Sequence, residues 1–164
     1  MPIPTIAALN GSAIGAGACL ALACDMRYAT ESASIGFTFI RLGINPGMGA
    51  EYLLYRLVGP AKTKELLMTG DILSAKDAGA LGLVNRVVPD VQLRDTVMDI
   101  ARRITRMPAV PLKVIKENTD HAHRGTLSDI LHKEAVFQGI TFQEPNFQEG
   151  VRAILEKRAP EFKD

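Results

Sequence analysis

The chain has 164 residues, of which 47% are hydrophobic and 23% charged, and its formal net charge is +1. This length and composition predict one soluble globular domain that needs no disulfide or metal ion to hold its core. With a net charge near zero and no long run of one sign, nothing electrostatic indicates nucleic acid or an anionic membrane as a partner. The apolar segment 13–24 is too short to span a bilayer.

The first half of the sequence alternates short apolar runs with glycine-rich turns, which predicts an α/β layer. The strands expected there cover residues 5–9, 26–29, 34–37 and 83–88. The helices expected between them cover residues 17–23, 51–57, 61–69 and 75–80, with Pro60, Gly70 and Ser74 as their boundary residues. The succession of strand, loop and helix from residue 5 onward indicates the first half of a parallel crossover unit.

After Pro89 the pattern becomes helical. Amphipathic helices are expected at residues 92–106, 110–123, 127–139 and 146–157. In the first of them, one face carries the apolar side chains of Leu93, Val97, Ile100, Ala101 and Ile104. The sequence therefore predicts two regions: an α/β core over residues 1–89 and a helical region over residues 90–164.

Two cysteines, Cys19 and Cys24, lie in the same apolar run. Five residues apart on a helix, they point to different sides, so we expect no disulfide between them. Free thiols are typical of a reducing cytoplasm, which is the location predicted for the protein.

The segment NGSAIGAGACLALACD, residues 10–25, contains three glycines at the start of a predicted helix. No Lys-Ser or Lys-Thr pair follows them, and the full dinucleotide fingerprint is absent. The free backbone N–H groups of such a turn suit an oxyanion, and the small residues Gly15, Ala16 and Gly17 let a ligand oxygen approach. Alternatively, these residues only permit close packing of a helix on a strand.

Three stretches, IAALNGSAIGAGACLALACDMRYAT, ASIGFTFIRLGINPGMGAEYLLYRLVG and LLMTGDILSAKDAGALGLVNRVVP, resemble the enoyl-CoA hydratase/isomerase (crotonase) family. The C-terminal EKRAPEFKD is similar to the ending of the same family. The resemblance implies an α/β spiral fold of the crotonase type, of which this chain would form about the last two-thirds, without the N-terminal section. It also implies a helical C-terminal trimerisation region and a homo-oligomer, either a trimer or a hexamer.

The resemblance implies acyl-CoA chemistry, with a coenzyme A thioester as substrate and no further cofactor. In the family, two backbone N–H groups hold the thioester carbonyl and stabilise the enolate; one of them matches Ala16. The second is expected from the N-terminal section. A helix dipole behind Ala16 would support the developing charge.

The two glutamates that family hydratases use as acid and base match Cys19 and Phe39 here. Neither residue can supply a carboxylate, so hydration by the usual residues is not expected. Phe39 would line an acyl pocket or fill the core. Asn45 could orient a water molecule or serve turn chemistry before Pro46.

Glu51 could reach the site as an acid or base, or could complement a helix N-terminus. Lys157 matches a lysine that reaches the CoA phosphate of a neighbouring subunit, although it could equally be a solvated charge. His121 and His123 are two residues apart on a predicted helix, so no metal site is expected. Three functions stay open: an acyl-CoA enzyme, a non-catalytic homologue that binds acyl-CoA or a partner, and an inert folded fragment.

Overall fold

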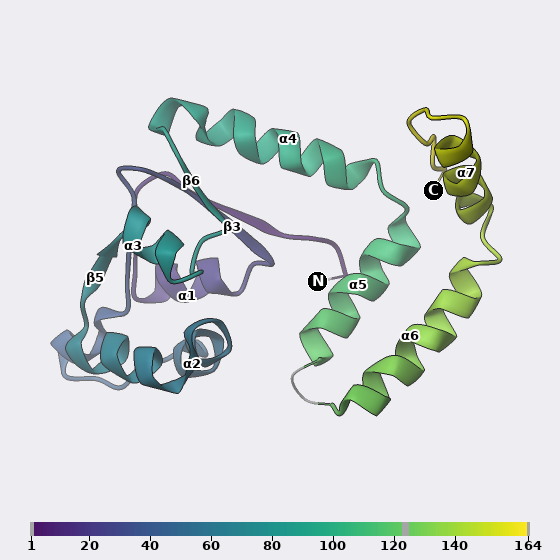
Figure 1. Ribbon diagram of the computed structural model, residues 1–164. Coiled ribbons are helices and arrows are strands. Elements are labelled where there is room, and N and C mark those ends of the chain that lie inside the picture. Colours follow the sequence, from purple (N-terminus) through teal and green to yellow (C-terminus); the bar gives the residue numbers. More distant parts are fainter. Residues whose placement is uncertain (1, 123–124, 164) are drawn as a thin grey trace. The chain divides into compact units, whose positions relative to one another are not determined.

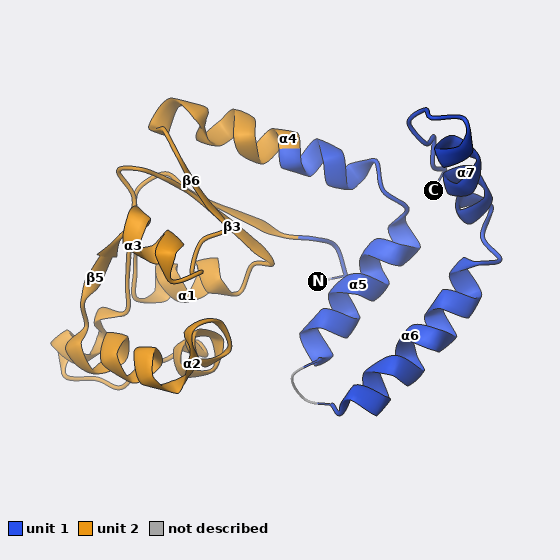
Figure 2. Cartoon of the chain, viewed as in Figure 1, with its two compact units in different colours: residues 1–4, 100–164 blue, residues 5–99 orange. Residues whose placement is uncertain are grey.

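The structure is a computed structural model that describes residues 2–122 and 125–163 (Figure 1). It divides into two compact units (Figure 2). We call residues 5–99 the α/β unit, and residues 1–4 with 100–164 the helical unit. Helix α4 (Leu93–Thr105) contributes residues to both.

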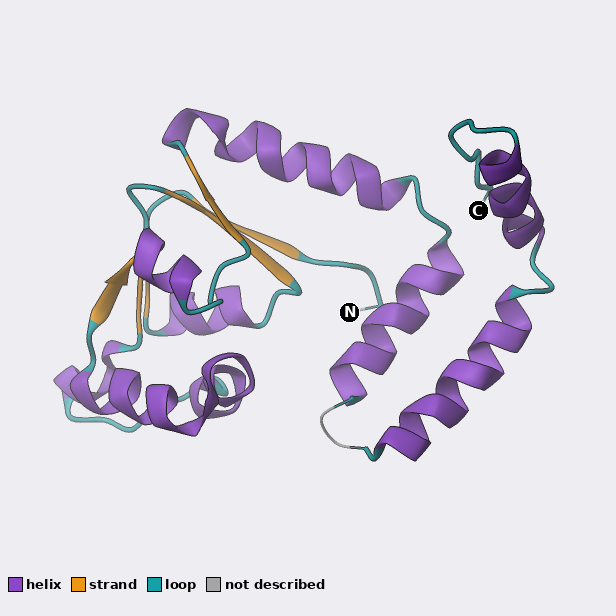
Figure 3. Cartoon of the chain, in the orientation of Figure 1, coloured by secondary structure: helices purple, strands orange, loops and turns teal. Residues whose placement is uncertain are grey.

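The strands of the α/β unit form two sheets (Figure 3). The strands are β1 (Ile6–Leu9), β2 (Ser12–Ile14), β3 (Met26–Thr30), β4 (Ser34–Gly36), β5 (Ile72–Ser74) and β6 (Arg86–Val88). In the first sheet β3 lies between β1 and β6, and all three run parallel. In the second sheet β4 pairs in parallel with β2 and antiparallel with β5. The parallel pairing of β1 with β3 across α1 (Ala16–Leu22) confirms the predicted crossover unit.

The predicted strand set was incomplete. It omitted β2 and β5, which have three residues each. Both are too short to show an alternating pattern, and they are strands because β4 supplies their hydrogen-bonding partners. The predicted strand 83–88 is also too long, since β6 begins only at Arg86.

Helix α2 (Ala50–Thr69) contains the two helices predicted at residues 51–57 and 61–69. Gly59 separates them, with φ 72° and ψ 175°, and Pro60 begins the second helical segment. Gly70 ends the helix in the left-handed conformation at φ 66°. Helix α3 (Ala75–Ala80) follows Ser74, its predicted boundary residue, whose hydroxyl accepts a hydrogen bond from the Asp77 N–H.

The core of the α/β unit joins α1 and α2 to strand β4. Its largest fully buried side chains are those of Phe37, Ile35, Leu54, Leu66, Leu83 and Cys19. Two 3₁₀ turns, η1 (Thr38–Leu42) and η2 (Asp90–Gln92), connect the strands and helices around this core. The turn η1 follows β4 closely and carries Phe39, which packs against the core from the side.

The helical unit contains α5 (Ala109–His121), α6 (Leu127–Thr141) and α7 (Pro145–Leu155), close to the predicted ranges. The capping box that begins α6 is complete, with Thr126 and Asp129 each accepting a hydrogen bond from the other's backbone N–H. His123 lies outside the described residues. Within the described part of the chain, no helix has the length and apolar character needed to cross a membrane.

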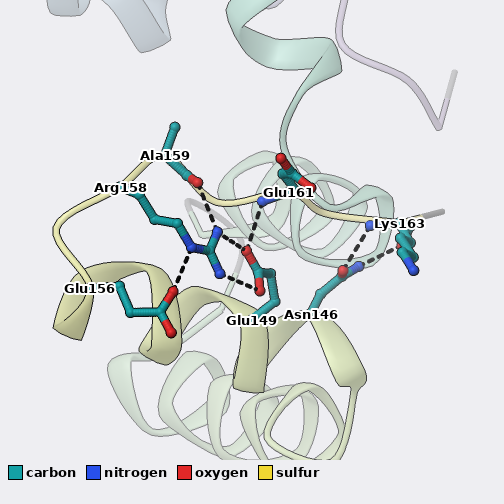
Figure 4. Close-up of polar contacts among 7 residues, drawn as sticks. All are labelled: Asn146, Glu149, Glu156, Arg158, Ala159, Glu161 and Lys163. Carbon is teal, nitrogen blue, oxygen red and sulfur yellow. Dashed lines mark hydrogen bonds and ion pairs between the residues drawn. The ribbon is translucent and has the colours of Figure 1, made fainter.

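The residues that follow α7 are held against it by polar contacts (Figure 4). The Glu149 carboxylate accepts two hydrogen bonds from the Arg158 guanidinium, at 2.6 and 3.0 Å, and one from the Glu161 N–H at 2.9 Å. The Asn146 side chain exchanges two hydrogen bonds with the backbone of Lys163, at 2.7 and 2.9 Å. The bidentate arginine contact is the geometry that gives strong charge-assisted hydrogen bonds.

These contacts predict a pH dependence for the C-terminal segment. Hydrogen bonds from Arg158 and from the Glu161 N–H lower the pKa of Glu149 from 4.5 to about 2. Because the pKa is lowered in the folded state, the contact stabilises fully above pH 4.5 and is lost as the pH falls from there through 2. A carbon-detected NMR titration of the Glu149 carboxyl should show this low midpoint, and Arg158→Gln should raise it; a midpoint at 4.5 in the unaltered chain would contradict the contact.

Candidate functional site

The glycine-rich turn brings the chain from β2 into α1 at Gly15. Its φ of 55° and ψ of −114° lie in a region that favours glycine. The Gly15 N–H donates to the Gly36 carbonyl at 2.8 Å, and the Gly15 carbonyl accepts from the Cys19 N–H at 3.1 Å. The entrance to α1 is therefore fixed to the end of β4 on one side and to its own first turn on the other.

Ala16 is the first residue of α1, and it is exposed. At this position the backbone N–H has no acceptor inside the helix, and among the described contacts no other group accepts from it. Gly17 is also exposed, and a Cβ built there would meet no atom within 4 Å. The start of α1 thus offers backbone donors beside open space, an arrangement that suits an oxygen anion.

Phe39 borders this turn from η1. A Cβ on Gly15 would lie 3.9 Å from the Phe39 Cζ atom, so the ring comes close to the turn. The side chain is half-buried and packs against the hydrophobic core. The position of Phe39 is compatible with both expected roles, as a wall of an acyl pocket and as a side chain of the core.

Cys19 lies one turn into α1 and is only 1% exposed. Its thiol donates a weak hydrogen bond to the Gly47 carbonyl, with an S···O distance of 3.8 Å. Burial raises the pKa of the Cys19 thiol, so the neutral form predominates near pH 7. A neutral thiol inside the core behaves as a small hydrophobic side chain and supplies no carboxylate-like acid or base.

Gly47 joins the loop after η1 to both neighbouring helices, because its carbonyl also accepts from the Ala50 N–H at 3.1 Å. Asn45, in this loop, is exposed, and its Nδ2 donates to the Pro46 carbonyl at 3.1 Å, which is turn chemistry. Glu51 is exposed in the first turn of α2, where a carboxylate complements the helix N-terminus. The Gly47 carbonyl thus links helix α1, which carries Cys19, to the loop that contains Asn45 and to the start of α2, which contains Glu51.

Lys157 belongs to the helical unit. It is exposed, follows α7, and adopts a φ of 55°, while its N–H donates to the Ile154 carbonyl at 3.2 Å. Among the residues that the structure describes, no group of three or more His, Cys, Asp or Glu side chains is arranged to hold a metal ion.

Gly36 is a positioning residue of the turn that sequence reasoning missed. A Cβ there would lie 2.9 Å from Ile72 Cγ1 and 3.3 Å from Ile72 Cα, so a side chain at this position would collide with β5 unless the strands shifted apart. An isolated glycine inside a predicted strand is a known signal for such a close backbone approach, and it was available at this position.

The comparisons with known proteins agree on one family. The family model described as enoyl-CoA hydratase/isomerase matches residues 1–164. The chain belongs to this family. The crotonase-type α/β fold predicted from the sequence is confirmed by solved enoyl-CoA hydratase structures, among them one from Bacillus anthracis with a TM-score of 0.95 at 39% identity.

Relatives within the enoyl-CoA hydratase/isomerase family carry different activity names. The chain is 38% identical over 162 residues to 1,2-epoxyphenylacetyl-CoA isomerase of Escherichia coli, and 38% identical over 162 residues to crotonyl-CoA hydratase of Syntrophomonas wolfei. Each match covers 99% of this chain and 62% of the relative. The Bacillus anthracis structure is likewise covered over 63% of its length, against 99% of this chain.

The close packing at Gly36 predicts that Gly36→Ala is destabilising, by about 1–3 kcal/mol, because the added methyl group overlaps β5. Gly17→Ala is the matched control. It adds a methyl group in open space within a helix, and should be neutral or stabilise by up to about 1 kcal/mol. Urea unfolding followed by circular dichroism measures both. Equal stabilities for the two variants would contradict the close approach of β4 and β5.

The burial of Cys19 predicts that its thiol is protected from reagents. In a Cys24→Ser variant, where Cys19 is the remaining thiol, reaction with Ellman's reagent should be at least about a hundredfold slower in buffer than in guanidinium chloride. The Cys19→Ala variant retains the half-buried Cys24 and should react faster in buffer. Rapid reaction of Cys19 in the folded chain would show that its thiol is accessible.

Proposed function

We propose that this chain binds acyl-CoA thioesters and that the N–H of Ala16 donates a hydrogen bond to the thioester oxygen. The observation that carries the proposal is the turn at Gly15. At the exposed start of α1, it leaves the Ala16 N–H with no acceptor among the residues that the structure describes. Membership of the enoyl-CoA hydratase/isomerase family supports the ligand class. Gly15 and Gly17 would leave room for the oxygen to approach the backbone.

The hydrogen bond from Ala16 would strengthen as negative charge develops on the oxygen. A donor fixed in the fold costs no reorganisation at that moment, which is how an oxyanion hole lowers a barrier. Helix α1 has seven residues, so its dipole adds a modest contribution near its first turn. The reaction class that follows is one in which a thioester enolate, or a state resembling it, forms and collapses.

Hydration by two glutamates is not part of this proposal. It requires two carboxylates that hold a water molecule and move a proton. Cys19 is a buried neutral thiol and Phe39 an aromatic ring. We propose Glu51 as the candidate acid or base and Asn45 as the candidate that orients water or a carbonyl, with Phe39 as a wall of the acyl pocket.

The proposed assembly is a homo-oligomer in the cytoplasm, a trimer or a hexamer. In it, the exposed Lys157 of one copy would meet the CoA phosphate bound to another copy. The thioester is the substrate, and the proposed chemistry uses no metal ion and no further cofactor.

A second candidate function is non-catalytic binding of acyl-CoA or of a partner subunit, or no activity at all in this chain alone. The observation that favours it is the pair Cys19 and Phe39, because a site without its usual acid and base can retain affinity without turnover. Turnover of a panel of enoyl-CoA substrates separates the enzyme from the binding homologue.

The test is calorimetric titration of the purified chain with acetoacetyl-CoA, an enolate mimic, and with free CoA. We expect acetoacetyl-CoA to bind at least about tenfold more tightly, a difference of about 1.4 kcal/mol. Binding of neither ligand would contradict the proposal and would identify the chain as inert by itself.

Ala16→Pro tests the donor itself. Proline is tolerated at the first position of a helix and removes only the N–H, so the preference for acetoacetyl-CoA should disappear while the fold persists. Ala16→Gly keeps the N–H and is the matched control, in which the preference should remain. An unchanged preference in Ala16→Pro would show that another group holds the thioester oxygen.

A further inference from the structure

Arg27, on β3, is a charged side chain that is only 6% exposed. Its guanidinium donates to three backbone carbonyls: those of Leu83 at 2.7 Å, Cys24 at 2.6 Å and Leu22 at 3.5 Å. Its backbone N–H donates to the Asn85 side chain at 2.8 Å. One side chain therefore joins the C-terminal end of α1 to the turn that precedes β6.

The sequence of α1 does not stabilise its own ends. Its last turn contains no basic residue, its first turn contains no acidic residue, and its N-cap, Gly15, supplies no side-chain hydrogen bond. Seven residues are also too few for a helix to persist alone in water. The cation at the C-terminal end of α1 comes instead from Arg27, a residue of the neighbouring strand. Its guanidinium donates to the carbonyl of Leu22, the last residue of the helix, and to that of Cys24, two residues beyond. The carbonyls of Cys19 and Ala21 accept from the backbone N–H groups of Ala23 and Cys24.

The opposite end of α1 carries Ala16. A helix of seven residues is about 10 Å long and rigid on that scale, so a shift at its last turn moves its first turn as well. On that side the helix is fixed by the hydrogen bond from Gly15 to Gly36. These two attachments, together with the buried face of α1 and the contact of the Cys19 thiol with Gly47, hold the Ala16 N–H in place.

We propose that Arg27 is a positioning residue for the Ala16 N–H: by holding the C-terminal end of α1, it fixes the direction of the donor that meets the thioester oxygen. This inference rests on the proposed function of Ala16. A misplacement of about 1 Å at a reacting group is enough to lower its contribution substantially. The expected effect therefore falls on recognition of the enolate mimic more than on affinity for CoA.

The test uses two variants of the full chain. Arg27→Met keeps an apolar side chain and removes the guanidinium donors. Arg27→Lys keeps the positive charge and removes the planar guanidinium group. The readout is the ratio of the acetoacetyl-CoA and CoA affinities, which a general loss of stability does not change. We expect this ratio to fall at least about threefold in Arg27→Met, with Arg27→Lys between it and the unaltered chain.

Ser74→Ala is the matched control. It removes the side-chain cap of α3 and lowers the stability of the same unit without altering a contact of α1. Its affinity ratio should equal that of the unaltered chain. A folded Arg27→Met variant with an unchanged ratio overturns the inference and leaves the proposed function standing.

A measurement on the unaltered chain tests the inference even where neither Arg27 variant folds. Coupling between two sites is reciprocal, so binding at Ala16 must stabilise the Arg27 contacts if those contacts favour binding. Acetoacetyl-CoA should slow the solvent exchange of the Arg27 Nε–H observed by NMR, and free CoA should not. Exchange that acetoacetyl-CoA leaves unchanged overturns the inference, whereas the absence of any preference for acetoacetyl-CoA overturns the proposed function and this inference with it.

Discussion

The hydrogen bond from the Gly15 N–H to the Gly36 carbonyl is the constraint on which the candidate site depends. It requires a residue that adopts a positive φ at one end and a residue without a side chain at the other, since β5 leaves no space beside Gly36. The bond places the start of α1 against the end of β4, from which η1 then carries Phe39 to the same turn. One contact thus fixes the start of α1 relative to β4 and η1.

Local chemistry predicted the boundaries of α2 and α3 and the parallel crossover from β1 to β3, whereas it did not predict the strand pairings of the second sheet. Pro60 and Gly70 act through their own backbone preferences, and Ser74 caps the helix that follows it, so each is visible in a short stretch of sequence. Strands β2 and β5 have three residues each and depend on β4, which is distant along the chain. The same distinction holds for the candidate site. The glycine-rich turn could be predicted from the sequence, whereas its attachment through Gly36 and Gly47 required the tertiary structure.

Cys19 and Phe39 have a structural role in the α/β unit, because both contribute to its hydrophobic core. A glutamate at the position of Cys19, which is 1% exposed, would need buried partners for its charge or would remain protonated. The thiol needs neither, and its contact with the Gly47 carbonyl joins α1 to the loop before α2. Cys19 and Phe39 therefore contribute packing in this chain.

Helix α1 is held at both ends by residues outside it. Gly36 accepts the hydrogen bond at its entrance, and Arg27 donates to the carbonyls of Leu22, its last residue, and of Cys24, two residues beyond it. A donor on a short helix is useful in an oxyanion site only when its supporting residues fix it before the ligand arrives, because a loose donor must be ordered at the expense of binding free energy. This support is independent of the side chains of Cys19 and Phe39, since neither Gly36 nor Arg27 depends on them for its hydrogen bonds. In the proposed function, recognition of the thioester oxygen therefore depends on a backbone donor and its supports, whereas proton transfer depends on side chains that take no part in this support.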